Sequence, residues 1–526
     1  MNLPSGAHAQ QDDIELISSS ITLPNGVVVP NRLVKAAMEE GIGNGGSLPG
    51  ANHQRLYRRW AKGGWGIIMT GNVQVDPRHL ATPHDLTVSS NPSRTLSAYS
   101  ALADSIRSSV PSVATPPLLI MQISHAGLQS SPTNLSRPPW VAAVAPTSAR
   151  PNTGDGVFAW IVGRVMWPMK SRTIVDVGEW LGIVENFVKT AKMAEEAGWD
   201  GVEVHSAHGY LLAEYLSPLT NPNPVALPSV PEHIPIHLHL LYLILIGIQD
   251  VTERKFIKAV KVNCSDFVQG GKFFIVCLDE ERAADVVKEI VSWKLVDMLE
   301  ISGGNYSNPA FASLEAVTAH PTRQSLFSHF TTNLLPSLSP PPTGPAIILT
   351  GGLHSRTLIA SSLRTRACDL IGIGRPAAVK PELPNEVVLN RELEEGKAII
   401  GGYGIPGGER LKQMLGGGKS HTPDITPTVE GSHLEAADAN SESTTEVTPL
   451  LSTKASATDT QKKNRGVPLV GAGVSTFWHE WQLCRIGRGL EPDLEMSWLW
   501  GGLVVEGIWW GMLGGGPLGW FKGSKE

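Results

Sequence analysis

Eight short apolar runs recur between residue 30 and about residue 390, and most are separated by a segment long enough to form a helix. The runs are residues 33–38, 66–71, 117–124, the start of 199–221, 256–263, 296–302, 346–350 and 369–374. Buried strands that alternate with helices are typical of a parallel α/β protein, and eight such units predict a closed (β/α)8 TIM barrel. An open doubly wound sheet is the alternative, but the glycine-rich dinucleotide turn expected after an early strand is missing.

The composition changes after about residue 395, so we assign residues 17–395 to the barrel. Residues 415–465 are rich in small, polar and acidic residues with little to bury, which predicts a disordered linker. Residues 467–526 are apolar and rich in tryptophan, and 498–521 is long enough to span a bilayer. Because this segment holds many glycines and Glu506, it could instead lie at a membrane surface or pack on the barrel.

Charge and cysteine content restrict the class of protein. The net charge is -6 and no basic block is present, so we expect no nucleic-acid partner. The four cysteines have no metal-ligand spacing and fit a reducing compartment. The first residues lack the basic and apolar regions of a signal peptide. We therefore expect a cytoplasmic protein, with 498–521 as the one candidate membrane contact; the oligomeric state stays open.

The stretch 199–221 carries the densest set of reactive side chains. It begins as a buried strand and then presents His205, His208 and Tyr210 before an apolar helix start. The carboxyl ends of barrel strands are where chemistry is done, and imidazoles and phenols carry protons. A single histidine beside a strand is usually structural, so spacing alone leaves a site and a structural role about equally supported. No third ligand follows at metal spacing, and no metal site is predicted.

Two glycine-rich strand ends come late in the barrel. Gly351 and Gly352 follow the seventh run, and Gly374 and Arg375 follow the eighth. Barrels often bind a phosphate in these two loops, where glycine lets the backbone approach and arginine adds a paired charge. Turn formation alone is the other explanation, since one glycine pair is weak evidence.

Two polar residues lie inside otherwise apolar runs. Gln122 ends the third run, where its amide could pair with a pyrimidine edge or merely cap a loop. Lys261 lies within the fifth run, and a buried charge there needs a charged partner or a polar ligand.

Together these residues resemble the Old Yellow Enzyme family of FMN-dependent NAD(P)H:flavin oxidoreductases and NADH oxidases, in its fungal-type branch. The resemblance covers roughly residues 17–390, and its most specific piece is HSAHGYLLAEYLSPLTN at 205–221. Five further motifs follow the family's order: NRLVKAAM at 31–38, QISHAG at 122–127, EISGGNYSNP at 300–309, TGGLHSR at 350–356 and DLIGIGRP at 369–376.

The resemblance implies a role for each candidate residue. His205 and His208 would hydrogen-bond a substrate carbonyl, and Tyr210 would donate a proton to an activated alkene. The residues that would surround FMN are Ala37 and Met38 beside the ring, Gly71 as a small neighbour, Gln122 at the pyrimidine edge, Lys261 near N1/O2, and Gly351, Gly352, Gly374 and Arg375 at the phosphate. NADH or NADPH would deliver the hydride in a ping-pong reaction with an enone, quinone or oxygen.

The chain also departs from the family pattern. Glu39 follows the methionine where many members have Thr or Cys, and a carboxylate there would disfavour a reduced flavin anion. Leu128 replaces an expected arginine, and residues 222–250 replace the usual segment, although their later part could supply the fourth barrel helix. A non-catalytic or specialised flavin-binding barrel is therefore a second interpretation, and a barrel enzyme with another phosphorylated ligand is a third.

Overall fold

The computed structural model describes residues 5–43, 48–134, 136–151, 153, 157–218, 220–264, 280–302, 330–401, 405–407, 468–498 and 500. The linker predicted at 415–465 and nearly all of the apolar segment 498–521 lie outside these residues. Within the described part of the chain, no helix is long and apolar enough to cross a membrane.

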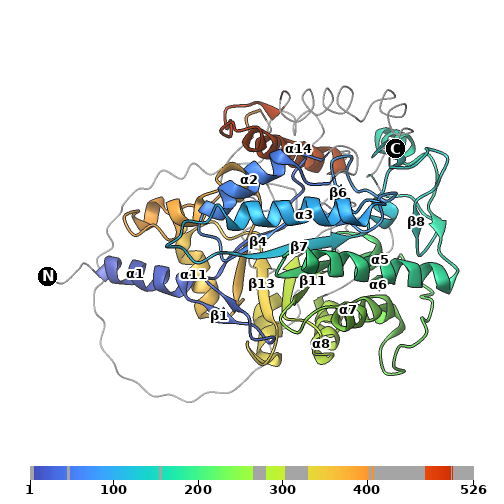
Figure 1. The fold of residues 1–526 in the computed structure, drawn as a ribbon, viewed down its shortest axis with the longest axis horizontal. Coiled ribbons are helices and arrows are strands. Elements are labelled where there is room, and N and C mark those ends of the chain that lie inside the picture. The colour runs from blue at the N-terminus through green and yellow to red at the C-terminus, as the bar shows by residue number, and fades with distance from the viewer. Residues whose placement is uncertain are drawn as a thin grey trace, which may run out of the picture.

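Eight parallel strands close into a barrel, which confirms the predicted fold and excludes the open sheet (Figure 1). In barrel order they are β3 (Leu33–Lys35), β4 (Ile67–Met69), β7 (Leu118–Ser124), β10 (Gly201–Ser206), β11 (Ile257–Asn263), β12 (Met298–Ser302), β13 (Ala346–Thr350) and β14 (Leu370–Ile373). The ring closes because β14 pairs with β3 and β7 pairs with β10, all in parallel. Each of the eight predicted apolar runs supplies one strand.

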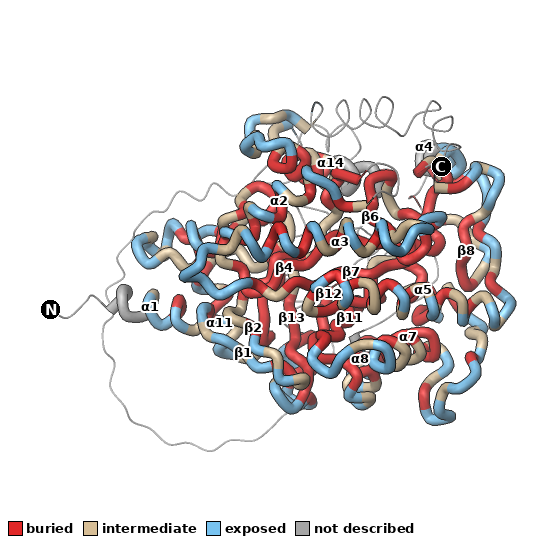
Figure 2. Tube along the Cα trace, viewed as in Figure 1, coloured by how far each residue is buried: buried red, intermediate tan, exposed pale blue. Residues whose placement is uncertain are grey.

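The strands are apolar because both of their faces are covered. β10, β11 and β12 are buried along their whole length, and the buried segments in Figure 2 follow the barrel wall. Helices cover the outer face, so a strand in this position needs continuous rather than alternating hydrophobicity. One apolar cluster inside the barrel includes Ile67, Ile120 and Ile348, and a larger one lies between strands and helices.

The described helices surround this sheet. They are α1 (Ser5–Ser18), α2 (Ala51–Lys62), α3 (Pro92–Arg107), α4 (Val157–Met166), α5 (Val177–Glu196), α6 (Leu211–Leu216), α7 (His239–Val251), α8 (Glu280–Ser292), α11 (Arg356–Arg364), α12 (Arg375–Val379) and α14 (Pro468–Gly487). The expected helix at 177–198 is α5: Asp176 caps its first turn, and Trp180, Ile183 and Phe187 are buried on its inner face.

Short strands and single turns complete the described structure. The strands are β1 (Ile21–Thr22), β2 (Val28–Val29), β5 (Val73–Gln74), β6 (Leu86–Thr87), β8 (Val144–Ala145) and β9 (Arg172–Thr173). The turns are η1 (Gly127–Gln129), η2 (Pro132–Asn134), η3 (Ile236–Leu238), η4 (Leu335–Ser337), η5 (Pro384–Val388) and η6 (Glu395–Lys397).

The unusual segment 222–250 does supply the helix that follows the fourth strand of the barrel. Its later half forms α7, which packs against α5 and leads into β11. Leu241, Ile244, Leu245 and Ile248 are buried on the inner side of this helix. The sequence departs from the family pattern here, yet it still provides the apolar face that the barrel requires.

The C-terminal helix α14 packs back on the barrel. It lies against α2 and α12, and it is the red helix at the top of Figure 1. Cys484 Sγ donates a hydrogen bond to the Gly41 carbonyl over 3.0 Å, and Arg55 Nε donates to the Gly487 carbonyl over 2.6 Å. The part of 467–526 that the structure describes is therefore docked on the segment that follows the first barrel strand.

Candidate active site

The chain makes a sharp turn between β10 and α6. His208 has φ 59° and Gly209 has φ 74°, both in the left-handed region. Non-glycine residues adopt this conformation at a cost of about 1–3 kcal/mol, and such residues cluster at functional sites. The turn reverses the chain within three residues, so that His205, His208 and Tyr210 all lie at the carboxyl end of β10.

The three side chains form one connected group. His205 Nε2 lies 2.9 Å from His208 Nδ1, and His208 Nε2 lies 2.9 Å from the Ser302 hydroxyl at the end of β12. The Tyr210 ring stands edge-on to His205, with ring centroids 4.6 Å apart. The cluster that the sequence predicted is therefore assembled, with an added hydroxyl from a second strand.

Both imidazoles are neutral. Burial lowers the pKa of His205 and of His208 well below the usual range, and the nearby Lys261 ammonium lowers both pKa values further. A neutral imidazole has one N–H donor and one acceptor nitrogen, so the proton positions in this pair are set by the groups around it.

Polar side chains form a layer in the barrel beside these histidines, where Lys261 is the register partner of His205. Gln122 Nε2 donates to Glu203 Oε1 over 2.6 Å, and Lys261 Nζ lies 2.8 Å from Glu300 Oε1. Parallel pairing places Glu203 beside Gln122 and Glu300 beside Lys261. The sequence required a charged partner or polar ligand for Lys261, and Glu300 on the next strand is such a partner.

The segment after the first strand packs against the second. Met38 is half-buried, as is Ala37. A Cβ at Gly71 would lie 2.4 Å from both the Met38 carbonyl oxygen and Glu40 Oε2, so only glycine fits there. A Cβ at Gly374 would lie 3.6 Å from Met38 Sδ. These four residues, which the resemblance groups around a flavin, are therefore neighbours.

The two glycine-rich turns also come together. Gly351 has φ 98° and Gly352 has φ 81°, a conformation that favours glycine, and a Cβ added at Gly351 would meet nothing within 4 Å. Burial lowers the pKa of Arg375, and Arg375 in turn lowers the pKa of His354, which burial has already depressed. The guanidinium of the second turn is thus close to the residues that follow the first.

Glu39 is held as a neutral acid rather than as the carboxylate expected from the sequence. Burial raises the pKa of Glu39 well above the usual range, and the Asp85 carboxylate raises it further. Asn72 Nδ2 donates a hydrogen bond to Glu39 Oε1. A side chain without charge would not impose the electrostatic penalty on a reduced flavin anion that the sequence led us to expect.

Four site residues received no role from the sequence: Asn72, Glu203, Glu300 and Ser302. Glu300 and Ser302 lie within the EISGG motif, and Asn72 directly follows Gly71 at the end of the second run. Their places at the ends of barrel strands were the sequence signal that could have marked them as site residues. Their partners lie on other strands, and only the barrel register brings them together.

A second polar cluster lies outside this group. Asp76, His79 and His125 are buried close together and have the residue types of a metal site. However, Asp76 already accepts two hydrogen bonds from Arg78, at 2.8 and 3.0 Å. His125 Nδ1 accepts from the Gly127 amide at 3.1 Å, which places the ring proton on Nε2; ligation through Nε2 would move that proton to Nδ1 and break this hydrogen bond.

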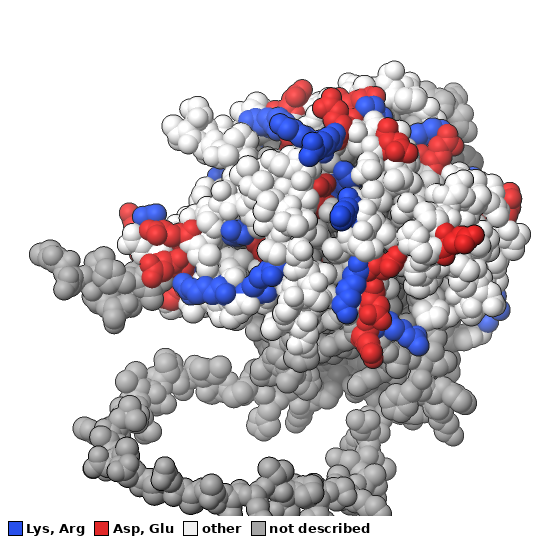
Figure 3. All heavy atoms as spheres, turned by 90° about the horizontal axis from the view of Figure 1, so that it is seen from below, with Lys and Arg blue, Asp and Glu red and all other residues white. Residues whose placement is uncertain are grey.

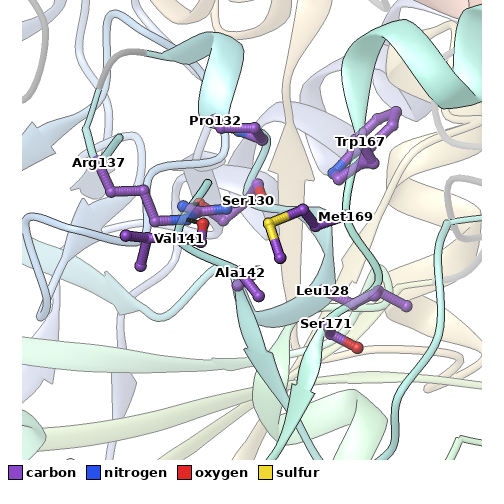
Figure 4. Close-up of a pocket in the computed structure, with 10 residues that line it drawn as sticks. Leu128, Ser130, Pro132, Arg137, Val141, Ala142, Trp167, Met169 and Ser171 are labelled. Carbon is purple, nitrogen blue, oxygen red and sulfur yellow. Dashed lines mark hydrogen bonds between the residues drawn. The ribbon is translucent and has the colours of Figure 1, made fainter. Parts of the chain in front are cut away.

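A small pocket lies nearby in the loop region before α5 (Figure 4). Its lining includes Leu128, which replaces the arginine expected from the family, together with Arg137 and Met169. The Arg137 guanidinium donates to the carbonyls of Ser130, Val141 and Arg78. Arg137 therefore braces the loop, and the pocket is separate from the histidine cluster.

Comparisons with known proteins agree with this geometry. Residues 20–223 match the NADH:flavin oxidoreductase / NADH oxidase family. The chain is 34% identical over 401 residues to the NADH-dependent flavin oxidoreductase iliE of Hypocrea jecorina (strain QM6a), covering 76% of this chain and 95% of that protein. It is 30% identical over 390 residues to the NADH-dependent flavin oxidoreductase iccE of Talaromyces variabilis, covering 72% and 88%.

Solved structures support the fold. The Old Yellow Enzyme homologue from Zymomonas mobilis matches with a TM-score of 0.50 and 17% identity, over 70% of this chain and 91% of that chain. A 2-naphthoyl-CoA reductase in complex with 2-naphthoyl-CoA matches with a TM-score of 0.59 and 19% identity, over 74% and 54%. Family match, sequence identity and fold together show that this chain belongs to the NADH:flavin oxidoreductase / NADH oxidase family, the Old Yellow Enzyme family that its motifs predicted.

Proposed function

We propose that the protein binds FMN at the carboxyl-terminal mouth of the barrel and transfers hydride from NADH or NADPH to a small acceptor. The acceptor is an activated alkene, a quinone or oxygen. The single observation that carries this proposal is the group of His205, His208 and Tyr210 at the end of β10. This group lies next to the polar layer that contains Lys261. FMN, when bound, supplies the group that accepts and releases the hydride.

The late turns fit a phosphate. Gly351 and Gly352 leave the backbone uncovered, and the space in front of Gly351 is open to a ligand. Arg375 contributes a positive charge within reach of the same turns. Backbone N–H groups and a guanidinium are the donors that phosphate oxygens prefer.

The polar layer fits the pyrimidine edge of a flavin. The Gln122 carboxamide offers donor and acceptor together, and Lys261 supplies a positive charge in the layer. Lys261 is not isolated, since Glu300 pairs with it, so the layer is close to neutral before a cofactor binds. Ala37, Met38, Gly71 and Gly374 provide the small and apolar surface that a flat ring needs.

His205, His208 and Tyr210 act on the acceptor. A neutral imidazole N–H can donate a hydrogen bond to an acceptor carbonyl and draw electron density from a conjugated alkene. Tyr210 is buried beside His205, and its phenolic hydroxyl can deliver a proton to the carbon next to the carbonyl.

The direct test uses the purified full-length protein. It should be yellow, with the absorption of bound flavin, and the ligand released on denaturation should have the mass of FMN. Anaerobic NADH or NADPH should bleach the flavin band, and 2-cyclohexen-1-one should restore it. A colourless protein that also fails to take up added FMN would overturn the proposal. Bound FMN without reduction by NADH or NADPH would support a specialised flavin-binding barrel.

We further propose that residues 17–395 form the FMN-binding unit and that 467–526 begins with a docking helix. The packing of α14 on α2 supports the second part. Membrane contact through 498–521 stays a prediction from composition. Recovery of the full-length protein entirely in the supernatant without detergent would count against that contact.

A further inference from the structure

Asn72 lies where three parts of the site meet. It follows the end of β4 and is only 5% exposed. Its Oδ1 lies 2.9 Å from His205 Nδ1, and its Nδ2 bonds Glu39 and lies 3.3 Å from the Tyr210 hydroxyl. One carboxamide thus contacts a residue that would hold the acceptor and the residue that would protonate it.

The Asp85 carboxylate fixes where the nearby proton resides. Asp85 accepts hydrogen bonds from Gln74 Nε2 over 2.8 Å, from the Ala81 amide over 2.7 Å and from the Thr82 hydroxyl over 2.8 Å. A carboxyl surrounded by donors is stabilised in its charged form. Glu39 shares a hydrogen bond with Asp85. Burial raises the pKa of both carboxyls, but the donors around Asp85 partly offset this effect, whereas burial and Asp85 together raise the pKa of Glu39 well above its usual range. The proton between the two carboxyls therefore belongs to Glu39.

The orientation of the Asn72 amide follows from that proton. The Glu39 hydrogen points to Asp85, so Glu39 Oε1 accepts from Asn72 and the Asn72 NH2 group faces Glu39. The Asn72 carbonyl oxygen must then face His205, and an oxygen can only accept. His205 therefore carries its ring proton on Nδ1, and its Nε2 accepts from His208 Nδ1.

We propose that Asn72, oriented by Glu39, is a positioning residue that fixes the ring proton of His205 on Nδ1. The His208 Nδ1–H, which His205 Nε2 accepts in this structure, is then the ring N–H of the pair that an acceptor carbonyl would take over on binding. The carbonyl part of this inference rests on the proposed function; the proton positions do not. Glu39 departs from the family pattern, and this inference gives it a role. As a neutral acid it selects one of the two orientations that the Asn72 side-chain amide could adopt.

The proton position can be read in the unmodified protein. Two-bond 15N–1H spectra of the full-length protein with 15N-labelled histidine distinguish a protonated from an unprotonated ring nitrogen, and the His205→Gln spectrum identifies the His205 signals. We expect His205 protonated at Nδ1 and unprotonated at Nε2. A neutral His205 protonated at Nε2 would overturn the proposal whether or not the protein turns over an acceptor.

Two substitutions at Glu39 then separate positioning from packing. Glu39→Gln keeps an oxygen for Asn72 and an N–H for Asp85, so it should retain the His205 proton on Nδ1 and a KM for 2-cyclohexen-1-one within about threefold of the parent. Glu39→Leu fills the same space without either bond. It should give mixed His205 proton positions and raise that KM by about 10- to 100-fold, the range seen when a partner that orients a metal-bound histidine is removed.

The reduction of bound flavin by NADH separates this inference from the proposed function. If the parent protein binds no flavin or is not reduced, the proposed function fails, while the 15N result still decides the proton position. If NADH reduces the flavin of the parent protein normally, an unchanged KM and an unchanged His205 spectrum in Glu39→Leu would contradict the positioning role. A Glu39→Gln protein as impaired as Glu39→Leu would do the same.

Discussion

The ammonium of Lys261 lies 2.8 Å from the carboxylate of Glu300, and both side chains are almost completely buried, at 5% and 0% exposure. Burial opposes both charges, but Glu300 raises the pKa of Lys261, and Lys261 lowers the pKa of Glu300. Burial and the Glu300 charge raise the pKa of Glu203 well above the usual range. The layer therefore holds one cation and one anion, and Glu203 completes it as a neutral acid.

Removing the cation alone should destabilise the protein strongly. Lys261→Met leaves Glu300 buried without its partner, which typically costs about 3–5 kcal/mol. We expect a lower urea midpoint and weaker FMN retention. The double variant Lys261→Met/Glu300→Met removes both charges and should regain a large part of the lost stability. Equal midpoints for the single and double variants would show that the two side chains are not energetically coupled.

Tyr210→Phe should slow proton delivery without disturbing flavin reduction. The phenylalanine ring keeps the edge-on contact with His205 but loses the hydroxyl. Proton transfer by a positioned side chain contributes on the order of 100- to 10,000-fold. Stopped-flow measurement should show that loss in the oxidative half-reaction with 2-cyclohexen-1-one, while NADH reduces the flavin at nearly the parent rate. An equal loss in both half-reactions would make the assignment of Tyr210 wrong.

A methyl group at Gly71 should disrupt the site, whereas one at Gly182 should not. Gly71→Ala places a Cβ 2.4 Å from Met38 O and Glu40 Oε2, and overpacking of this kind costs about 1–3 kcal/mol. Gly182 lies within α5 with nothing within 4 Å of an added Cβ, so Gly182→Ala should stabilise the protein by up to about 1 kcal/mol. Urea midpoints and bound FMN per chain, measured for both variants, test the contrast.

Acid should destabilise the folded protein below about pH 6.5, in part through two buried histidines. Burial lowers the pKa of His125 and of His479 to about 3, with neighbouring cations contributing. Both folded-state pKa values lie below the unfolded value, so between about pH 6.5 and 3 the unfolded chain binds protons that the folded chain does not. Each histidine then removes up to about 1.4 kcal/mol of stability per pH unit as the pH falls.

Urea denaturation at pH 7, 6, 5 and 4 checks this slope. His479→Gln should flatten it, and His233→Gln, at an exposed position before α7, serves as the matched control. An unchanged slope in His479→Gln would show that this imidazole is protonated in the folded state or does not stay buried.

The barrel was predictable because its determinants are local. Each strand is a continuous apolar run, and each intervening helix carries its own apolar face, so length and periodicity locate them without knowledge of the neighbours. Even 222–250, where the motif is lost, keeps the apolar periodicity of α7. The position of Lys261 within an apolar strand predicted that it has a charged partner or polar ligand. Only the register between β11 and β12 identifies Glu300 as that partner.

The proton arrangement at the site could not be predicted in the same way. It depends on contacts between Asn72 and His205, which are 133 residues apart, and on the ionisation of Glu39 beside Asp85. The sequence presented Glu39 as a carboxylate, since its burial and its acidic neighbour are properties of the folded chain. The sequence has no basic block, and on the face shown in Figure 3 cationic and anionic side chains are interspersed.

The docking of α14 has a consequence for how the protein is made. The hydrogen bond from Cys484 to Gly41 joins residues 443 positions apart, across the whole length of the barrel sequence. Because a ribosome synthesises the chain from the N-terminus onward, α2 and the loop at Gly41 emerge long before α14 has been made. The surface around Gly41 therefore stays uncovered until α14 has been made, and α14, the last helix in the described part of the chain, closes over a segment that was among the first.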